Sequence, residues 1–275
     1  MKRLVKILVV GFVFITYASC QKNEVVTPFD EIILSQQETQ GEEILADIDL
    51  LVDEAVDLNQ SQLKSATVTG GGYLSDCATV TVNKTATPKV ITIDFGTSCT
   101  GKDGKIRSGK IIVTSTSFNT FPSVRNKTFD NYTVDGKKIQ GTIEKTIAVD
   151  QENNIRTAEV KENITINFPG TEGTATRVST LTRQYQRGAN TTAADNKIVS
   201  WGTVAFTRVN GVVVTKTIAA ATPLVFNVAC HHIVSGIVTI TTSNKKTWTI
   251  NYGNGDCDNL ATVTIGDKTK EIKIR

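Results

Sequence analysis

The sequence predicts an all-β protein with one N-terminal α-helix, built as an antiparallel meander of about 12 strands. From Tyr73 onward the chain consists of Thr-, Val- and Ile-rich runs separated by turn residues, a pattern typical of β-strands. Asp135-Gly136 and Asn210-Gly211 stand between such runs, where tight hairpins need positive φ. No strand–helix alternation occurs, which excludes a doubly wound α/β fold. We expect a strongly curved sheet (a half-barrel) or a two-layer sandwich.

One amphipathic helix is predicted within residues 31–65. Its apolar residues recur at i, i+1, i+4, i+7, i+8, i+11 and i+12 and form one stripe: Ile44, Leu45, Ile48, Leu51, Val52, Ala55 and Val56. On this helix the acids should point outward: Asp47, Asp49, Asp53 and Glu54. Gly41 should interrupt or start its stable part. A stripe this wide must be buried, and a single helix needs one concave face to cover, which favours the curved sheet.

The chain begins like an exported protein. A basic start is followed by the apolar run Ile7–Ala18 and by Ser19-Cys20, so residues 1–19 are predicted to be a signal peptide. This segment resembles a bacterial lipoprotein signal, in which Cys20 is acylated, although Tyr17 departs from the usual pattern. The alternative is an ordinary secreted protein with Cys20 as a stray thiol. Residues 20–30 then form a tether, and residues 66–275 a single β domain.

The resemblance extends into the tether. Gln21-Lys22-Asn23-Glu24 is similar to the short charged export signals of surface lipoproteins of the Bacteroidota. It implies an envelope protein that the lipid anchors to the outer membrane, at the cell surface or alternatively at the periplasmic face.

Charge is balanced overall but unevenly distributed. After residues 1–19 are removed, 27 basic and 27 acidic residues remain, which argues against a nucleic-acid binder. Residues 21–63 hold eleven acids and one base, whereas residues 64–275 hold 26 bases and 16 acids. Either the acidic segment folds back on a basic surface of its own chain, or that surface meets an anionic partner such as a surface polysaccharide.

Four further cysteines lie in two similar stretches. Cys77 and Cys99 enclose two strand-like runs that end in Asp94-Phe95-Gly96, and Cys230 and Cys257 enclose two that end in Asn251-Tyr252-Gly253. The simplest pairing is therefore Cys77 with Cys99 and Cys230 with Cys257, as disulfides of an oxidising compartment. A metal site is the rival, but the close Cys-x-x-Cys pairs that zinc favours are missing.

The same repeat, together with Thr100–Lys110 and Asp256-Cys257-Asp258-Asn259, resembles a family of uncharacterised, β-rich, lipid-anchored lipoproteins of the Bacteroidota. The resemblance covers most of the β region. It implies the architecture and the anchoring, but the family carries no established activity, so no functional residue is transferred.

One predicted strand carries a candidate ligand site. Side chains at every second position share one face, which would align Arg177, Arg183, Tyr185 and Arg187. Guanidinium groups bind carboxylate, sulfate or phosphate, and tyrosine rings stack on sugars. These residues are the candidate binding residues for an anionic glycan. The alternative is a solvated outer face paired across strands with Glu144, Glu159 or Glu162.

No catalytic residue, metal or cofactor is predicted. His231 and His232 are adjacent, so on a strand they point to opposite faces, and a disulfide at Cys230 would prevent a thiol–imidazole pair. The stretch 253–259 could offer oxygen ligands to Ca²⁺, but a tight hairpin turn explains it. No motif of a hydrolase elbow, a zinc protease or a phosphate-binding loop occurs.

We therefore expect a non-enzymatic envelope lipoprotein that acts as a binding or interaction module for an anionic glycan or an envelope protein. An alternative is a carrier that holds a lipid or a lipoprotein in an apolar cleft between the sheet and the helix. A third is a polysaccharide-acting enzyme, because a carboxylate pair can be assembled in space rather than in sequence. The oligomeric state is not predicted.

Overall fold

The computed structural model describes residues 28–61, 67–69, 74–150, 155–170, 172–188, 196–243 and 246–274. The predicted signal peptide and Cys20 lie outside these residues. In the described part the chain forms one helix, α1 (Pro28–Ser61), and sixteen strands. The strands are β1 (Thr67–Thr69), β2 (Thr79–Asn83), β3 (Lys89–Asp94), β4 (Cys99–Thr100), β5 (Ile106–Ser115), β6 (Ser123–Val134), β7 (Lys137–Asp150), β8 (Ile155–Asn167), β9 (Thr174–Gln186), β10 (Lys197–Thr207), β11 (Val213–Ile218), β12 (Leu224–Asn227), β13 (His232–Thr242), β14 (Thr247–Asn254), β15 (Leu260–Ile265) and β16 (Lys268–Lys273).

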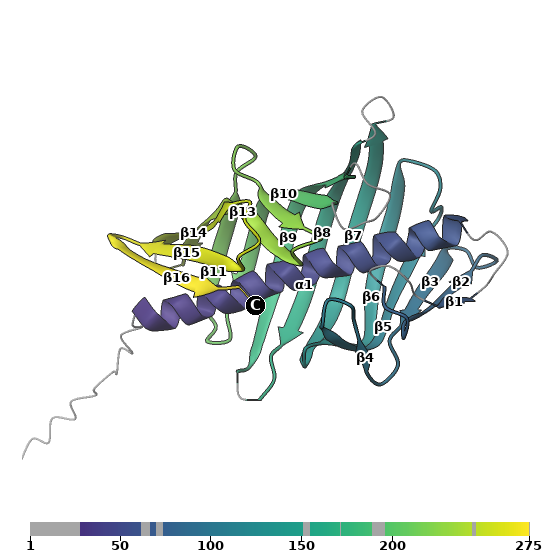
Figure 1. Ribbon diagram of the computed structural model, residues 1–275, viewed down its shortest axis with the longest axis horizontal. Helices are drawn as coiled ribbons and strands as arrows, with labels where there is room; N and C mark the ends of the chain where they lie inside the picture. The colour runs from purple at the N-terminus through teal and green to yellow at the C-terminus, as the bar shows by residue number, and fades with distance from the viewer. Residues whose placement is uncertain are drawn as a thin grey trace, which may run out of the picture.

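All sixteen strands belong to one antiparallel sheet. Fourteen of them pair in chain order from β1 to β16, while β4 pairs with β5, and β12 pairs with β10 and β13. The sheet curves into a partial ring, and α1 lies across its concave side (Figure 1). The predicted curved sheet is confirmed and the two-layer sandwich is wrong. The strands outnumber the expected twelve partly because β1, β4 and β12 have only two to four residues each.

Of the two predicted tight hairpin turns, the one at Asp135-Gly136 is confirmed and the one at Asn210-Gly211 is not. Between β6 and β7, Asp135 and Gly136 both have positive φ, at 48° and 76°, as a two-residue turn of type I′ requires. Between β10 and β11, Gly211 has a φ of 81°, but Asn210 is not among the described residues with positive φ. This connection is therefore not a type I′ turn.

Helix α1 begins within the predicted tether, at Pro28, and ends at Ser61. Proline suits the first helical position because an N–H there has no partner within the helix, so its absence from proline costs no hydrogen bond. The expected break at Gly41 is wrong, since the helix passes through it. Gly41 is buried, and a Cβ atom there would lie 3.4 Å from Cδ1 of Ile166 on β8. Glycine therefore lets the helix pass close to this side chain of the sheet.

The apolar core lies between α1 and the inward side of the sheet. All seven stripe residues of the helix are buried, as predicted, and they meet inward-facing side chains of most strands, such as Ile91, Val113, Ile164 and Ile240. The helix backbone comes closest to β3, β15 and β16, which lie near the two ends of the sheet. The central strands contact the helix mainly through long side chains.

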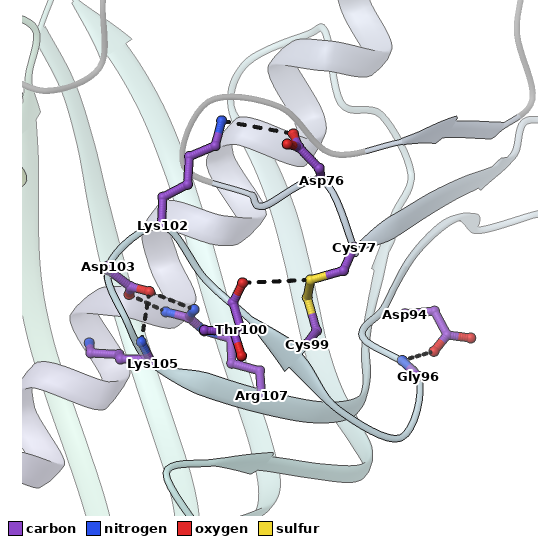
Figure 2. The surroundings of a disulfide bond; sticks show 10 residues. All are labelled: Asp76, Cys77, Asp94, Gly96, Cys99, Thr100, Lys102, Asp103, Lys105 and Arg107. Atoms are coloured by element: carbon purple, nitrogen blue, oxygen red, sulfur yellow. Dashed lines mark hydrogen bonds and ion pairs between the residues drawn. A yellow bond between two sulfur atoms is a disulfide. The ribbon is translucent and has the colours of Figure 1, made fainter.

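Two disulfides, Cys77–Cys99 and Cys230–Cys257, close loops with sequence separations of 22 and 27. Both predicted pairings are confirmed, and they indicate an extracytoplasmic protein. Figure 2 shows the first, beside the loop that joins β4 to β5. In that loop Asp103 accepts hydrogen bonds from its neighbours, including the backbone N–H of Lys105 and the guanidinium of Arg107.

Candidate functional site

Helix α1 carries a second, acidic set of buried side chains. They are Glu38, Glu42, Glu43, Asp47, Asp49 and Asp53, each at most 6% exposed. The expectation that Asp47, Asp49 and Asp53 point outward is wrong, because the curved sheet encloses the helix on its polar side as well as on its apolar side. Glu54 is half-buried and accepts a hydrogen bond from the backbone N–H of Leu74 at 2.9 Å.

Basic side chains of the sheet meet these acids. Among the described residues, eight cationic ones are buried: Arg107, Arg125, Lys127, Lys145, Arg177, Arg183, Arg208 and Lys216. With Glu38, Glu42, Asp47, Asp49 and Asp53 of the helix, and with Glu162 of β8, they form what we call the ionic seam. The acidic segment therefore folds back on a basic surface of its own chain, one of the two expected arrangements.

Asp49 lies at the centre of the ionic seam. Its carboxylate pairs with Lys127 of β6, with Nζ of Lys145 of β7 at 3.4 Å, and with Nη1 of Arg183 of β9 at 2.8 Å. One turn further along the helix, Asp53 accepts from Nη1 of Arg125 at 2.9 Å and from Nζ of Lys145 at 3.2 Å. Side chains of three strands, β6, β7 and β9, thereby form ion pairs with two successive turns of the helix.

Glu162 is the acid that the sheet itself contributes to the ionic seam. It accepts from Nε of Arg177 at 2.8 Å and from Nη2 of Arg183 at 2.7 Å, and it also accepts from the hydroxyl of Ser179. Arg177 donates in addition to Glu42 of the helix. Two arginines on one face of β9 thus each bridge a helix acid and a strand acid.

The two ends of the ionic seam are built differently. At one end, Nη2 of Arg107 lies 2.7 Å from Asp47 of the helix and 2.6 Å from Asp103 of the β4–β5 loop. At the other end, Nε of Arg208 lies 3.0 Å from Glu38, and its guanidinium carbon lies 4.8 Å from the ring centroid of Trp248. A cation–π contact therefore supports the ion pair at this end.

The ionic seam lowers the pKa of four of its carboxylates and so holds them in the charged form: Glu42, Asp49, Asp53 and Glu162. Burial by itself raises the pKa of Asp49, but the positive charges of Lys127, Lys145 and Arg183 outweigh it and hold that pKa well below the ordinary value. Burial opposes ionisation of Glu42 too, yet Arg177 and Lys216 lower its pKa to about 2. These acids therefore stabilise the fold at neutral pH, and their contribution is lost as the pH falls below their ordinary values.

Glu43 differs from the other buried helix acids. The backbone N–H of Ile233 donates to its carboxyl, but Oε1 is buried without a hydrogen-bond partner in the described part of the chain. Burial raises the pKa of Glu43 to about 8, and the positive charge of Lys105 only partly offsets it. The group is mostly protonated at neutral pH, whereas its neighbour Glu42 is charged.

The predicted ligand residues separate into two pairs. Arg177 and Arg183 are at most 4% exposed and face the helix, so the expectation of an accessible arginine row is wrong. The alternative partner Glu162 is confirmed, but the pairing lies on the concave side rather than on a solvated face. Tyr185 is half-buried, and the side chain of Arg187 is 59% exposed.

Tyr185 and Arg187 line a surface cavity of about 130 Å³, with Phe121, Val149 and Arg156. We call this cavity the arginine hollow. The guanidinium carbon of Arg156 lies 5.8 Å from the ring centroid of Phe121 and 5.9 Å from that of Tyr185. Nη1 of Arg156 is buried without a hydrogen-bond partner among the described residues, and Arg187 pairs with Asp57 at 3.4 Å.

Arg156 was missed by the sequence analysis. It lies directly opposite Tyr185 in the β8–β9 register, so extending the strand pairing from that tyrosine would have found it. A second cavity of about 10 Å³, room for about one water molecule, shares Arg156 and Tyr185 with the arginine hollow and is also lined by Asp49 and Asp53. The hollow therefore borders the ionic seam.

The other predicted motifs serve the fold. His231 has a φ of 59° in the turn before β13, and Nε2 of His232 accepts from the backbone N–H of Asn259 at 3.1 Å. Burial lowers the pKa of both imidazoles. Within the described residues, no three His, Cys, Asp or Glu side chains are placed to hold a metal ion, the stretch 253–259 included.

Comparison of the chain with protein-family models, with curated proteins and with solved structures gives no match. Of the described helical residues, no segment is long and apolar enough to cross a membrane as a helix. The proposed function therefore rests on the sequence and on the arrangement of the residues described above.

The ionic seam predicts that Asp49→Asn is strongly destabilising. The substitution leaves Lys127, Lys145 and Arg183 without their shared counter-charge, which costs about 3–5 kcal/mol for a buried pair. Asp57→Asn is the matched control, since it removes one long, partly exposed pair with Arg187 worth at most about 1 kcal/mol. Urea unfolding followed by circular dichroism measures both; equal small effects would contradict the central role of Asp49.

Glu43→Gln should stabilise the protein more at pH 8 than at pH 5. Because the pKa of Glu43 rises from 4.5 to about 8 on folding, the wild type loses stability as the pH rises through that interval. Glutamine does not ionise, so the variant avoids this loss. Calorimetry at pH 5, 6.5 and 8 should show a Tm difference that grows with pH, and a difference independent of pH would refute the assignment.

Proposed function

We propose that this protein is a non-enzymatic, lipid-anchored lipoprotein of the cell envelope that binds an anionic glycan through the arginine hollow. The observation that carries the proposal is the guanidinium of Arg156, which contacts two aromatic rings and keeps one buried nitrogen without a hydrogen-bond partner in the described residues. A buried donor without an acceptor is costly, and an anionic ligand would supply the acceptor.

The lining of the arginine hollow matches both parts of an acidic sugar. Arg156 and Arg187 offer two forks of N–H donors, which suit a carboxylate or a sulfate group. Phe121 and Tyr185 offer apolar ring surface against which a sugar can pack. The pair between Arg187 and Asp57 is long, and the arginine is exposed while the aspartate is half-buried, so a ligand can displace the arginine at little cost.

The concave side of the sheet suits a carrier or an enzyme less well. A carrier needs an apolar cleft, but helix α1 and the ionic seam fill this side, and the cavity beside Asp49 and Asp53 has room for about one water. The buried carboxylates Asp49 and Glu162 are held ionised by neighbouring cations, so neither suits the role of a general acid.

Anchoring through Cys20 rests on the sequence. The predicted export signal ends just before this residue, the chain resembles lipoproteins of the Bacteroidota, and the two disulfides agree with export. Helix α1 begins at Pro28, so only a short link would separate the lipid from the folded domain. Such an anchor places the domain close to the membrane, on the cell surface in our proposal.

Arg156→Ala and Arg187→Ala should each weaken binding of acidic glycans by about tenfold or more, the value of a hydrogen bond to a charged group. Residues 21–275, purified with both disulfides intact, would be titrated calorimetrically with uronate-containing and sulfated oligosaccharides. Lys161→Ala is the matched control, because this lysine is exposed on the outer face of β8. A variant that carries both Arg156→Ala and Arg187→Ala should bind most weakly. If it binds as tightly as the wild type, the arginine hollow is not the site.

Cys20→Ala should abolish lipid attachment. The wild type, expressed in a bacterium with a lipoprotein pathway, should incorporate labelled palmitate and partition into detergent, whereas the variant should do neither. Incorporation that persists in the variant would refute Cys20 as the acylated residue.

A further inference from the structure

Asp57 of helix α1 forms an ion pair with Arg187, one of the two arginines that line the arginine hollow. Within the described residues it accepts one side-chain hydrogen bond, from Nη2 of Arg187 at 3.4 Å. The side chain of Asp57 is 38% exposed and that of Arg187 is 59% exposed, so solvent reaches both partners. The protein therefore holds an anion of its own against a guanidinium that we propose for the ligand.

The surroundings of Asp57 act on its charge in opposite directions. Burial disfavours the ionised form, and so does the carboxylate of Asp53, which lies one turn earlier on the helix. The positive charges of Arg156 on β8, of Arg187 and of Arg125 on β6 favour the ionised form. Burial and Asp53 prevail, so the pKa of Asp57 lies above its ordinary value. Asp57 therefore takes up a proton more readily than Asp53, whose pKa is lowered.

The other titratable groups near Asp57 keep their charge state in mild acid. Burial raises the pKa of Tyr185 on β9, so its hydroxyl stays neutral. Burial disfavours the charge of Asp53, but Lys145 and Arg125 outweigh it, so Asp53 stays ionised. The two histidines of the chain meet charged groups of other elements, which for His231 are Asp103, Lys105, Asp47 and Arg107.

An anionic ligand in the arginine hollow competes with the carboxylate of Asp57. That carboxylate already occupies part of the guanidinium of Arg187, and it repels a second anion that is brought beside it. Protonation of Asp57 ends both the competition and the repulsion. The two positive charges of Arg156 and Arg187 then face the ligand without a negative charge of the protein between them.

We propose that Asp57 is a built-in competitor of the ligand and makes the arginine hollow bind anionic glycans more tightly in acid than at neutral pH. This inference rests on the proposed function and adds the regulation of the same site. As the anionic group of the ligand takes the place of the Asp57 carboxylate at Arg187, that carboxylate takes up a proton from solvent. Because binding favours the protonated form, linkage requires the affinity to rise as the pH falls.

The test compares the wild type with Asp57→Asn by calorimetric titration at pH 7.5, 6.0 and 4.5. The probe is a sulfated tetrasaccharide, because a sulfate group keeps its charge over this range and the pH then changes only the protein. Glu144→Gln is the matched control, since it removes one negative charge from an exposed ion pair with Lys161 on the outer face. Residues 21–275 of each are used with both disulfides intact, and thermal unfolding at each pH verifies that they are folded.

At pH 7.5, Asp57→Asn should bind about fivefold more tightly than the wild type, the equivalent of one partly exposed ion pair. The affinity of the wild type should rise towards that of the variant as the pH falls, while the variant changes by less than about twofold and Glu144→Gln follows the wild type. Equal or weaker binding by Asp57→Asn at pH 7.5, or a pH dependence that this variant retains, would overturn the inference and leave the arginine hollow as a binding site. Absence of binding by all three proteins at every pH would overturn the proposed function, and the inference with it.

Discussion

The fold depends on the ion pairs between the acids of helix α1 and the bases on the concave side of the sheet. In the part of the chain that the structure describes, eight buried cations and their carboxylate partners occupy a space that apolar side chains fill in most small domains. Removing such charges from water is costly, and their mutual attraction repays the cost only where every charge has well-placed partners. Asp49 meets this condition with three cations, and Glu162 does so with two arginines and a serine.

Ion pairs of this kind fix position more than they add stability. An apolar stripe alone would let the helix slide or rotate on a curved apolar sheet, because apolar contacts are not directional. The carboxylates of Asp49 and Asp53 must reach lysines and arginines on β6, β7 and β9, and this sets both the rotation and the register of the helix. The disulfides then close loops within the first and last parts of the sheet.

Most basic side chains of the concave side form buried pairs with acids of the helix, and those that do not are the ones left to bind a ligand. Arg177 and Arg183 form ion pairs with acids of the helix. Arg156 and Arg187 instead line the arginine hollow. The proposed site thus follows from how the sheet divides its arginines between the ionic seam and the arginine hollow.

The sequence by itself determined the strands, the apolar stripe of the helix, the disulfide pairs and the opposite charges of the helix and sheet segments, since each depends on local spacing or on simple counting. Only the tertiary structure decided which side of each element is buried. Asp49 looked solvent-exposed, and Arg183 looked like a surface ligand, because period and composition place a residue on a face without saying what covers that face. Arg156 was overlooked because it meets Tyr185 only across the strand register. The curvature of the sheet, which arises from many strands together and from no single segment, turned both polar faces inward.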